Sequence, residues 1–260
     1  MIKNYEISKE NHKKIYQNFM SDWLDKNLKV FTFKSNISSN NVKDFYDSFF
    51  SEIGRFLPYA EDATVTDRSK GRTGEVWMEI RNVSSIKNAY RHSTNSQPLH
   101  TDGSYIPNFP TSILTCVTNV KKGGETIFVN IESVLKDLKY FNIELYDFVT
   151  SENILHERCG ESRENKIFYL EKDILKVNFN YYCISDKNPE YILKFAKQLL
   201  NYFILIEKNQ RQDVELFQVK LNTGEAVIWK DDQILHGRHG FIAKHDSERF
   251  IWKAFYQPNF

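Results

Sequence analysis

The sequence lacks any apolar run near the 18 or so residues that a membrane-spanning helix needs. The longest approach, Leu199 to Ile206, is interrupted by Asn201. The N-terminal stretch MIKNYEISKENHKK is polar and has no apolar signal core. We therefore expect a cytoplasmic protein that has no membrane partner.

The sequence also lacks an excess of charge of one sign. Its 35 Lys+Arg residues face 34 Asp+Glu residues, so the formal net charge is +1. A nucleic-acid-binding protein usually carries a basic excess, so we expect no nucleic-acid partner. The same balance argues against a demethylase that acts on chromatin or RNA.

Cysteine, glycine and proline are scarce. The three cysteines lie far apart and form no CxxC pair, which argues against a disulfide framework and a zinc ribbon. With 10 Gly and 6 Pro in 260 residues, nothing marks a flexible boundary, so we expect one domain over residues 1–260.

Aromatic residues, in contrast, are abundant, with 20 Phe and 14 Tyr available for a large core. Apolar spacing predicts helices over residues 8–26 and 41–56 and a short strand over 28–33, within a helical N-terminal part of about 1–60 that is mixed in this way. From about 76 to 257, short runs rich in Val, Ile, Phe and Tyr predict a β core. Two helical stretches, 131–148 and 189–207, interrupt this core.

This pattern favours a mainly β fold, a jelly roll or cupin-like barrel with flanking helices. A parallel α/β sheet would need a helix after nearly every strand, and the second half of the chain lacks that rhythm.

A candidate metal-binding pair lies in the stretch QPLHTDGSY, residues 97–105. On an extended strand residues i and i+2 point to the same face, so His100 and Asp102 can bind one metal ion together. Such a pair is common by chance. The alternative is a surface histidine beside an Asp-Gly turn.

Two further residues extend the pair. His236, in the stretch ILHGRHGF, follows a predicted strand at 226–229 and could supply a third ligand across the barrel. Two histidines and one carboxylate on one face of an octahedral ion are the arrangement of non-haem Fe(II) oxygenases. Arg249 lies on the next predicted strand, where a guanidinium can pair with a distal carboxylate of a metal-chelated ligand.

These motifs resemble the taurine dioxygenase and clavaminate synthase-like family of Fe(II)- and 2-oxoglutarate-dependent oxygenases. The matching stretches are LHTDGSY at 99–105, GGET at 123–126, LHGRHGF at 235–241, and Arg249. The resemblance implies a double-stranded β-helix, in agreement with the predicted strands. It also implies that Fe(II) is the cofactor and that 2-oxoglutarate and O2 are co-substrates.

The resemblance assigns residue roles as well. His100, Asp102 and His236 would be the iron ligands and catalytic residues, while Arg249 and Thr126 would bind 2-oxoglutarate. Substrate contacts are expected from the segment before the metal pair and from residues around the ligands. These substrate candidates are Arg81, Asn82, Arg91, Tyr105 and Arg238.

Three of the substrate candidates have an alternative role. Arg81 and Arg91 would otherwise be solvated surface arginines, and Arg238 would brace the loop after His236.

Together these features predict a dioxygenase that hydroxylates a small polar molecule, such as an amino acid or a natural-product intermediate, and releases succinate and CO2. One alternative is desaturation, cyclisation or another oxidation on the same iron. An alternative of another class is a non-catalytic jelly roll that binds a metal or ligand. The sequence does not indicate the oligomeric state.

Overall fold

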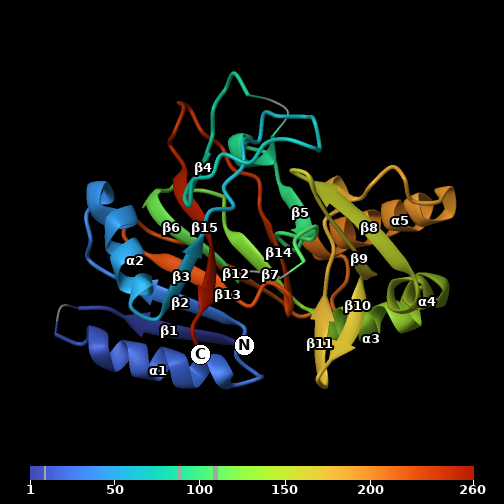
Figure 1. Cartoon of the computed structure of the whole chain (residues 1–260), viewed down its shortest axis with the longest axis horizontal. Coiled ribbons are helices and arrows are strands. Elements are labelled where there is room, and N and C mark those ends of the chain that lie inside the picture. Colours follow the sequence, from blue (N-terminus) through green and yellow to red (C-terminus); the bar gives the residue numbers. More distant parts are fainter. Residues whose placement is uncertain (9, 87–88, 108–110) are drawn as a thin grey trace.

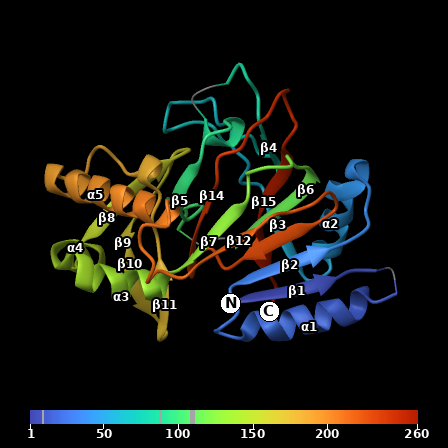
Figure 2. The same ribbon diagram turned by 180° about the vertical axis from the view of Figure 1, so that it is seen from behind.

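Two antiparallel-rich β-sheets form the centre of the molecule (Figures 1 and 2). The computed structural model describes residues 1–8, 10–86, 89–107 and 111–260. In the larger sheet, β1 and β2 pair in parallel and the other neighbours pair antiparallel. Its strands, in spatial order, are β1 (Ile2–Glu6), β2 (Val30–Lys34), β13 (Ala226–Trp229), β6 (Thr111–Thr118), β15 (Phe250–Pro258) and β3 (Gly54–Leu57), with β4 (Met78–Arg81) also on β15.

The smaller sheet is antiparallel throughout. Its strands, in spatial order, are β12 (Leu216–Val219), β7 (Thr126–Asn130), β14 (Ile234–Arg238) and β5 (Gln97–His100). Apolar side chains of both sheets share one core, in which Leu114 and Trp229 of the larger sheet meet Phe128 and Ile234 of the smaller one. The two sheets therefore pack face to face, as the predicted jelly roll requires.

The N-terminal helices cover one end of the larger sheet (Figure 1). Helix α1 (His12–Leu24) and helix α2 (Val42–Ser51) confirm the two predicted helices, although α2 ends five residues before the predicted end at 56. The chain instead enters β3 at Gly54, where a Cβ atom would lie 2.1 Å from the Tyr256 hydroxyl. Strand β2 overlaps the strand predicted over 28–33, whereas β1 and β3 were not predicted.

The other end of the molecule holds three helices and two hairpins. The predicted helical stretch 131–148 is two helices, divided at Asn142, whose side chain accepts a hydrogen bond from the Leu145 amide. The helix predicted over 189–207 is confirmed as α5. These elements are α3 (Ile131–Phe141), α4 (Ile143–Ser151), β8 (Asn153–Arg158), β9 (Glu161–Lys166), β10 (Phe168–Glu171), β11 (Ile174–Val177) and α5 (Glu190–Glu207).

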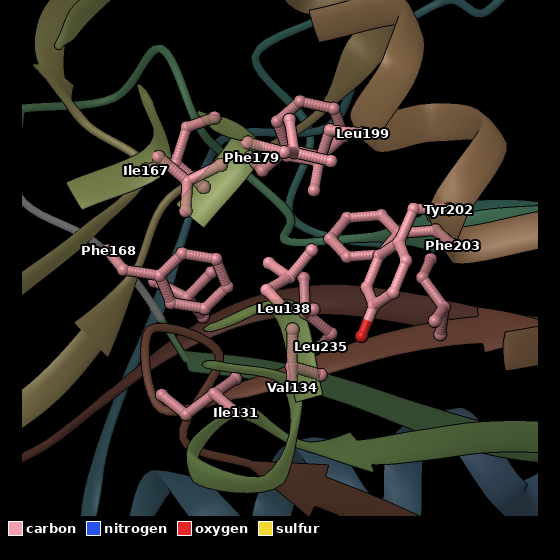
Figure 3. Close-up of a cluster of buried hydrophobic side chains, with 14 of the residues drawn as sticks. Ile131, Val134, Leu138, Ile167, Phe168, Phe179, Leu199, Tyr202, Phe203 and Leu235 are labelled. Carbon is pink, nitrogen blue, oxygen red and sulfur yellow. The ribbon is translucent and has the colours of Figure 1, made fainter. Parts of the chain in front are cut away.

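A second apolar core holds this end to the smaller sheet (Figure 3). Phe203 of α5 and Leu138 of α3 are fully buried, and Leu235 of β14 packs in the same cluster. Leu235 immediately precedes His236, so this core fixes the strand that carries a predicted ligand. Three short 3-10 turns complete the fold, at Ser39–Asn41, Tyr90–His92 and Tyr181–Cys183. No helix in the described ranges is long and apolar enough to span a bilayer.

Candidate active site

A cavity of about 290 Å³ opens between the two sheets, and the three predicted ligands line it. The ligand atoms of His100, Asp102 and His236 all lie within 4.8 Å of one another, and all three residues are buried. His100 ends β5 and is the register partner of His236 on β14, which brings the imidazoles together. Asp102 lies in the turn after β5 rather than on the strand that the sequence predicted.

The imidazoles are oriented for a shared ion. Nε2 of His100 lies 3.6 Å from one Asp102 oxygen, and Nε2 of His236 lies 3.4 Å from the other. Each Nδ1 atom points away from Asp102. His100 Nδ1 lies 2.8 Å from the Pro98 carbonyl oxygen, and His236 Nδ1 lies 3.2 Å from Asp231 Oδ1. The donor set of two imidazole nitrogens and one carboxylate therefore fits a metal with open positions.

Asp231 supports this group although sequence reasoning did not select it. Its Oδ1 accepts a hydrogen bond from Trp229 Nε1 at 2.9 Å, and its Oδ2 accepts one from the Asp102 amide at 2.9 Å. The Ser112 hydroxyl lies 3.2 Å from Oδ2 and donates at 2.7 Å to the Asp102 carboxylate. One buried carboxylate thus connects two of the three ligands.

Lys253 of β15 supplies a cation in the metal-free site. Its ammonium forms an ion pair with Asp102 Oδ1. Burial opposes ionisation of Asp102, but Lys253 and His236 outweigh it and hold the pKa of this carboxyl well below its usual range. Burial also disfavours the charged form of His236, yet Asp102 and Asp231 raise its pKa to about 9. Asp102 is therefore held in its ionised form, which is the form that can bind a divalent ion.

Arg249, the predicted co-substrate residue, lies deep in the same cavity and is 2% exposed. Its Nε has no hydrogen-bond partner among the described residues, and no ion pair with a carboxylate is formed there. Burial lowers its pKa to about 10. A buried guanidinium without a counter-ion is costly, so the site is suited to an anionic ligand.

Thr126 and Arg238 belong to the same cavity lining as Arg249. They face each other as register partners on β7 and β14, and both line the cavity. Arg238 Nη2 donates to the Ser93 carbonyl at 2.8 Å and to the carbonyls of Tyr90 and Asn95. Arg238 therefore braces the 90–95 segment rather than the loop after His236 that the sequence indicated.

The substrate candidates are distributed unevenly. Arg91 and Tyr105 line the cavity, whereas Arg81 and Asn82 are absent from its described lining. Arg81 pairs with Glu79 at 2.8 Å on the half-exposed side of β4. The Asn82 side chain accepts a hydrogen bond from the Arg249 amide at 3.1 Å, which gives it a supporting place behind the guanidinium.

The comparisons with known proteins agree with this geometry. Residues 29–255 match the family model described as "Taurine catabolism dioxygenase TauD, TfdA family". The chain belongs to this family. The resemblance inferred from the motifs is therefore confirmed over most of the sequence.

The curated relatives are distant. Human gamma-butyrobetaine dioxygenase is 24% identical over 195 residues, which cover 70% of this chain and 49% of that protein. Uridine-5'-phosphate dioxygenase of Streptomyces sp is 25% identical over 176 residues, with 63% and 62% covered. The chain thus spans about half the length of the first relative and slightly under two thirds of the second.

Solved structures support the fold. Asparagine oxygenase, in complex with Fe(II), 2S,3S-3-hydroxyasparagine and succinate, has a TM-score of 0.65 at 12% identity and covers 95% of this chain and 79% of its own. The non-heme iron oxygenase OrfP, in complex with Fe and alpha-ketoglutaric acid, has a TM-score of 0.66 at 12% identity, with 100% and 95% covered. This likeness confirms the predicted mainly β jelly roll.

Proposed function

We propose that the chain is an Fe(II)- and 2-oxoglutarate-dependent dioxygenase that hydroxylates a small polar molecule and releases succinate and CO2. The observation that carries the proposal is the placement of the buried His100–Asp102–His236 group and the uncompensated Arg249 in one cavity. The first can hold a divalent ion, and the second needs an anion. Family membership supports the same reaction class.

Each residue of the site has a defined task in the proposed reaction. His100, Asp102 and His236 hold the iron, and Arg249 pairs with the distal carboxylate of 2-oxoglutarate, beside the Thr126 hydroxyl. Bound iron would supply the activation of O2, coupled to the decarboxylation of 2-oxoglutarate. The apolar walls of the two sheets exclude water from the reacting groups.

The substrate class is a small polar molecule, such as an amino acid or a natural-product intermediate. The structural neighbours support this, because asparagine oxygenase and OrfP have been solved in complex with 2S,3S-3-hydroxyasparagine and (3S)-hydroxy-L-Arg. Desaturation or cyclisation on the same iron is the alternative outcome, since the product depends on how the substrate is posed. The proposal includes no nucleic-acid or membrane partner.

We also propose a cytoplasmic location. All three cysteines are buried and unpaired in the described structure, which suits a reducing compartment.

Metal analysis after anaerobic loading tests the iron site. The wild-type chain should bind one Fe(II), while His100→Ala and His236→Ala should bind it far more weakly because each loses one of three ligands. His239→Ala is the matched control, since His239 lies near Gln218 and outside the ligand group. Full iron content in both ligand variants would refute the assignment. Succinate release that depends on iron and 2-oxoglutarate then tests the reaction.

A further inference from the structure

A second polar cluster lines the cavity that contains the ligand group. It consists of Glu61, Arg91, Tyr105 and Arg158, which come from four separate segments of the chain. Tyr105 follows Asp102 by three residues, so their Cα atoms lie no more than about 11 Å apart. One small molecule can therefore reach both the ligand group and this cluster.

Glu61 is the centre of the cluster, and its carboxylate is fully engaged. Its side chain is only 9% exposed. The Tyr105 hydroxyl donates to Oε1, and Arg158 Nε donates to Oε2 at 2.6 Å. Arg91 Nη2 lies 3.4 Å from Oε2, and Arg91 Nη1 donates to the Glu61 carbonyl at 2.7 Å. Glu61 has no free oxygen for a cationic ligand, so its role is to hold the two arginines.

Arg158 is the open member of the cluster. Its Nε donates to Glu61, and neither Nη1 nor Nη2 makes a hydrogen bond with the described residues. The side chain ends β8, lines the cavity and is 27% exposed. A guanidinium fixed through Nε presents two parallel N–H groups, the geometry that pairs with a carboxylate or phosphate.

The charged residues that line the cavity also favour an anionic ligand. Among the described residues, its lining includes five cations and two carboxylates, which are Arg91, Arg158, Arg238, Arg249, Lys253, Glu61 and Asp102. A divalent ion and a dianionic co-substrate would cancel each other and leave this cationic excess unchanged. The remaining ligand of the cavity is therefore best matched by an anion.

We propose that Arg158 binds an anionic group of the substrate, a carboxylate or a phosphate, and that Glu61 is the positioning residue that orients it. This inference rests on the proposed function, because it assigns a substrate class to the proposed oxygenase. Binding of its anionic group by Arg158 holds the substrate in the cavity. The atom to be oxidised then lies next to the iron that His100, Asp102 and His236 would hold.

The test uses the metal-free full chain, so that it does not depend on iron chemistry. Inorganic phosphate is titrated at constant ionic strength and pH 7.5, and the melting temperature is followed. At ten times the dissociation constant, phosphate should raise Tm by a few degrees. Arg158→Gln should lose most of this rise. Arg249→Gln identifies any contribution of the buried co-substrate guanidinium, and Arg55→Gln, on an exposed arginine paired with Gln257, is the matched control.

The phosphate titrations of the variants distinguish support for the proposed site from its refutation. A phosphate effect lost in Arg158→Gln but kept in Arg249→Gln and Arg55→Gln supports the site, and an acetate titration shows whether carboxylate is preferred. If Arg158→Gln does not fold, Arg158→Lys replaces it, with phosphate binding weakened several-fold because the fork is lost. An equal phosphate effect in wild type and Arg158 variants, or no phosphate effect up to 100 mM, overturns the proposal. Succinate release from the iron-loaded chain is measured separately, so failure of the proposed function remains distinguishable.

Discussion

The support that Asp231 gives to the ligand group yields the sharpest test of the site. Trp229 Nε1 donates to Asp231 Oδ1 and the Asp102 amide donates to Asp231 Oδ2, while His236 Nδ1 and the Ser112 hydroxyl each lie 3.2 Å from one of the Asp231 oxygens. Asp231→Ala removes every acceptor and leaves buried donors unpaired. Leaving such a group unsatisfied costs about 1–3 kcal/mol.

The effect on iron follows from the same contacts. His236 and the Asp102 backbone both lose the group that orients them, and loss of such support typically weakens metal binding about 10–100-fold. We expect Asp231→Ala to weaken iron binding by about 100-fold. Asp231→Asn should weaken iron binding by nearer about 10-fold, because its one oxygen can still accept from Trp229 Nε1, although its NH2 group cannot accept from the Asp102 N–H.

Chelator competition under anaerobic conditions measures the iron affinity, and thermal melting shows whether the variants remain folded. Asp232→Asn is the matched control, because the neighbouring carboxylate pairs with Lys176 and lies outside the cavity lining described here. Wild-type iron affinity in a folded Asp231→Ala chain would refute the supporting role. A loss of affinity equal to that in Asp232→Asn would show that only net charge matters.

Three further predictions follow from the structure. Arg249→Lys should raise the KM for 2-oxoglutarate at least about tenfold and leave iron affinity unchanged, because the ammonium lacks the bidentate fork; an unchanged KM would contradict the assignment. Gly124→Ala should also raise this KM, since its Cβ would lie 3.2 Å from Arg249 Cδ, whereas Gly74→Ala, with a similar positive φ and nothing within 4 Å, controls for backbone strain. Burial raises the pKa of Glu207 to about 7, so ionisation of this carboxyl lowers the stability of the fold increasingly from about pH 4.5 to above pH 7. Glu207→Gln keeps an acceptor for the Leu99 amide but carries no charge. Denaturant unfolding should therefore show a larger gain in stability for this variant at pH 8 than at pH 5. An equal gain at both pH values would show that ionisation of Glu207 does not lower the stability of the folded chain.

The ligand residues could be predicted from the sequence because their chemistry is local. A His-x-Asp spacing and a later His with a trailing Arg are visible without a fold, and the structure brings them together. The strands that carry them were harder to predict. β5 contains Pro98, and β14 contains Gly237 and Arg238, so neither shows simple alternation.

The supporting residues could not be predicted for a different reason. Asp231 and Asp232 are adjacent carboxylates in a chain with 34 Asp+Glu residues, and no local pattern shows that one is fully engaged beneath the ligands. Glu61 and Arg158 lie 97 residues apart and meet only when the β8–β9 hairpin brings Arg158 to Glu61. Long-range pairing of this kind is set by topology, which single residues do not reveal.

The electrostatics of the cavity also weigh against a non-catalytic binding module. Asp102 is compensated by Lys253 and His236, whereas buried Arg249 forms no ion pair with the described residues and its Nε has no hydrogen-bond partner among them. A structural metal site usually closes its coordination with four protein ligands, but three ligands here face a cavity. An uncompensated buried guanidinium lowers the stability of the free protein, and a ligand that pairs with it offsets that loss only while bound. A cavity that gives up stability in this way is suited to an anion that binds and leaves, as a co-substrate does in each turnover.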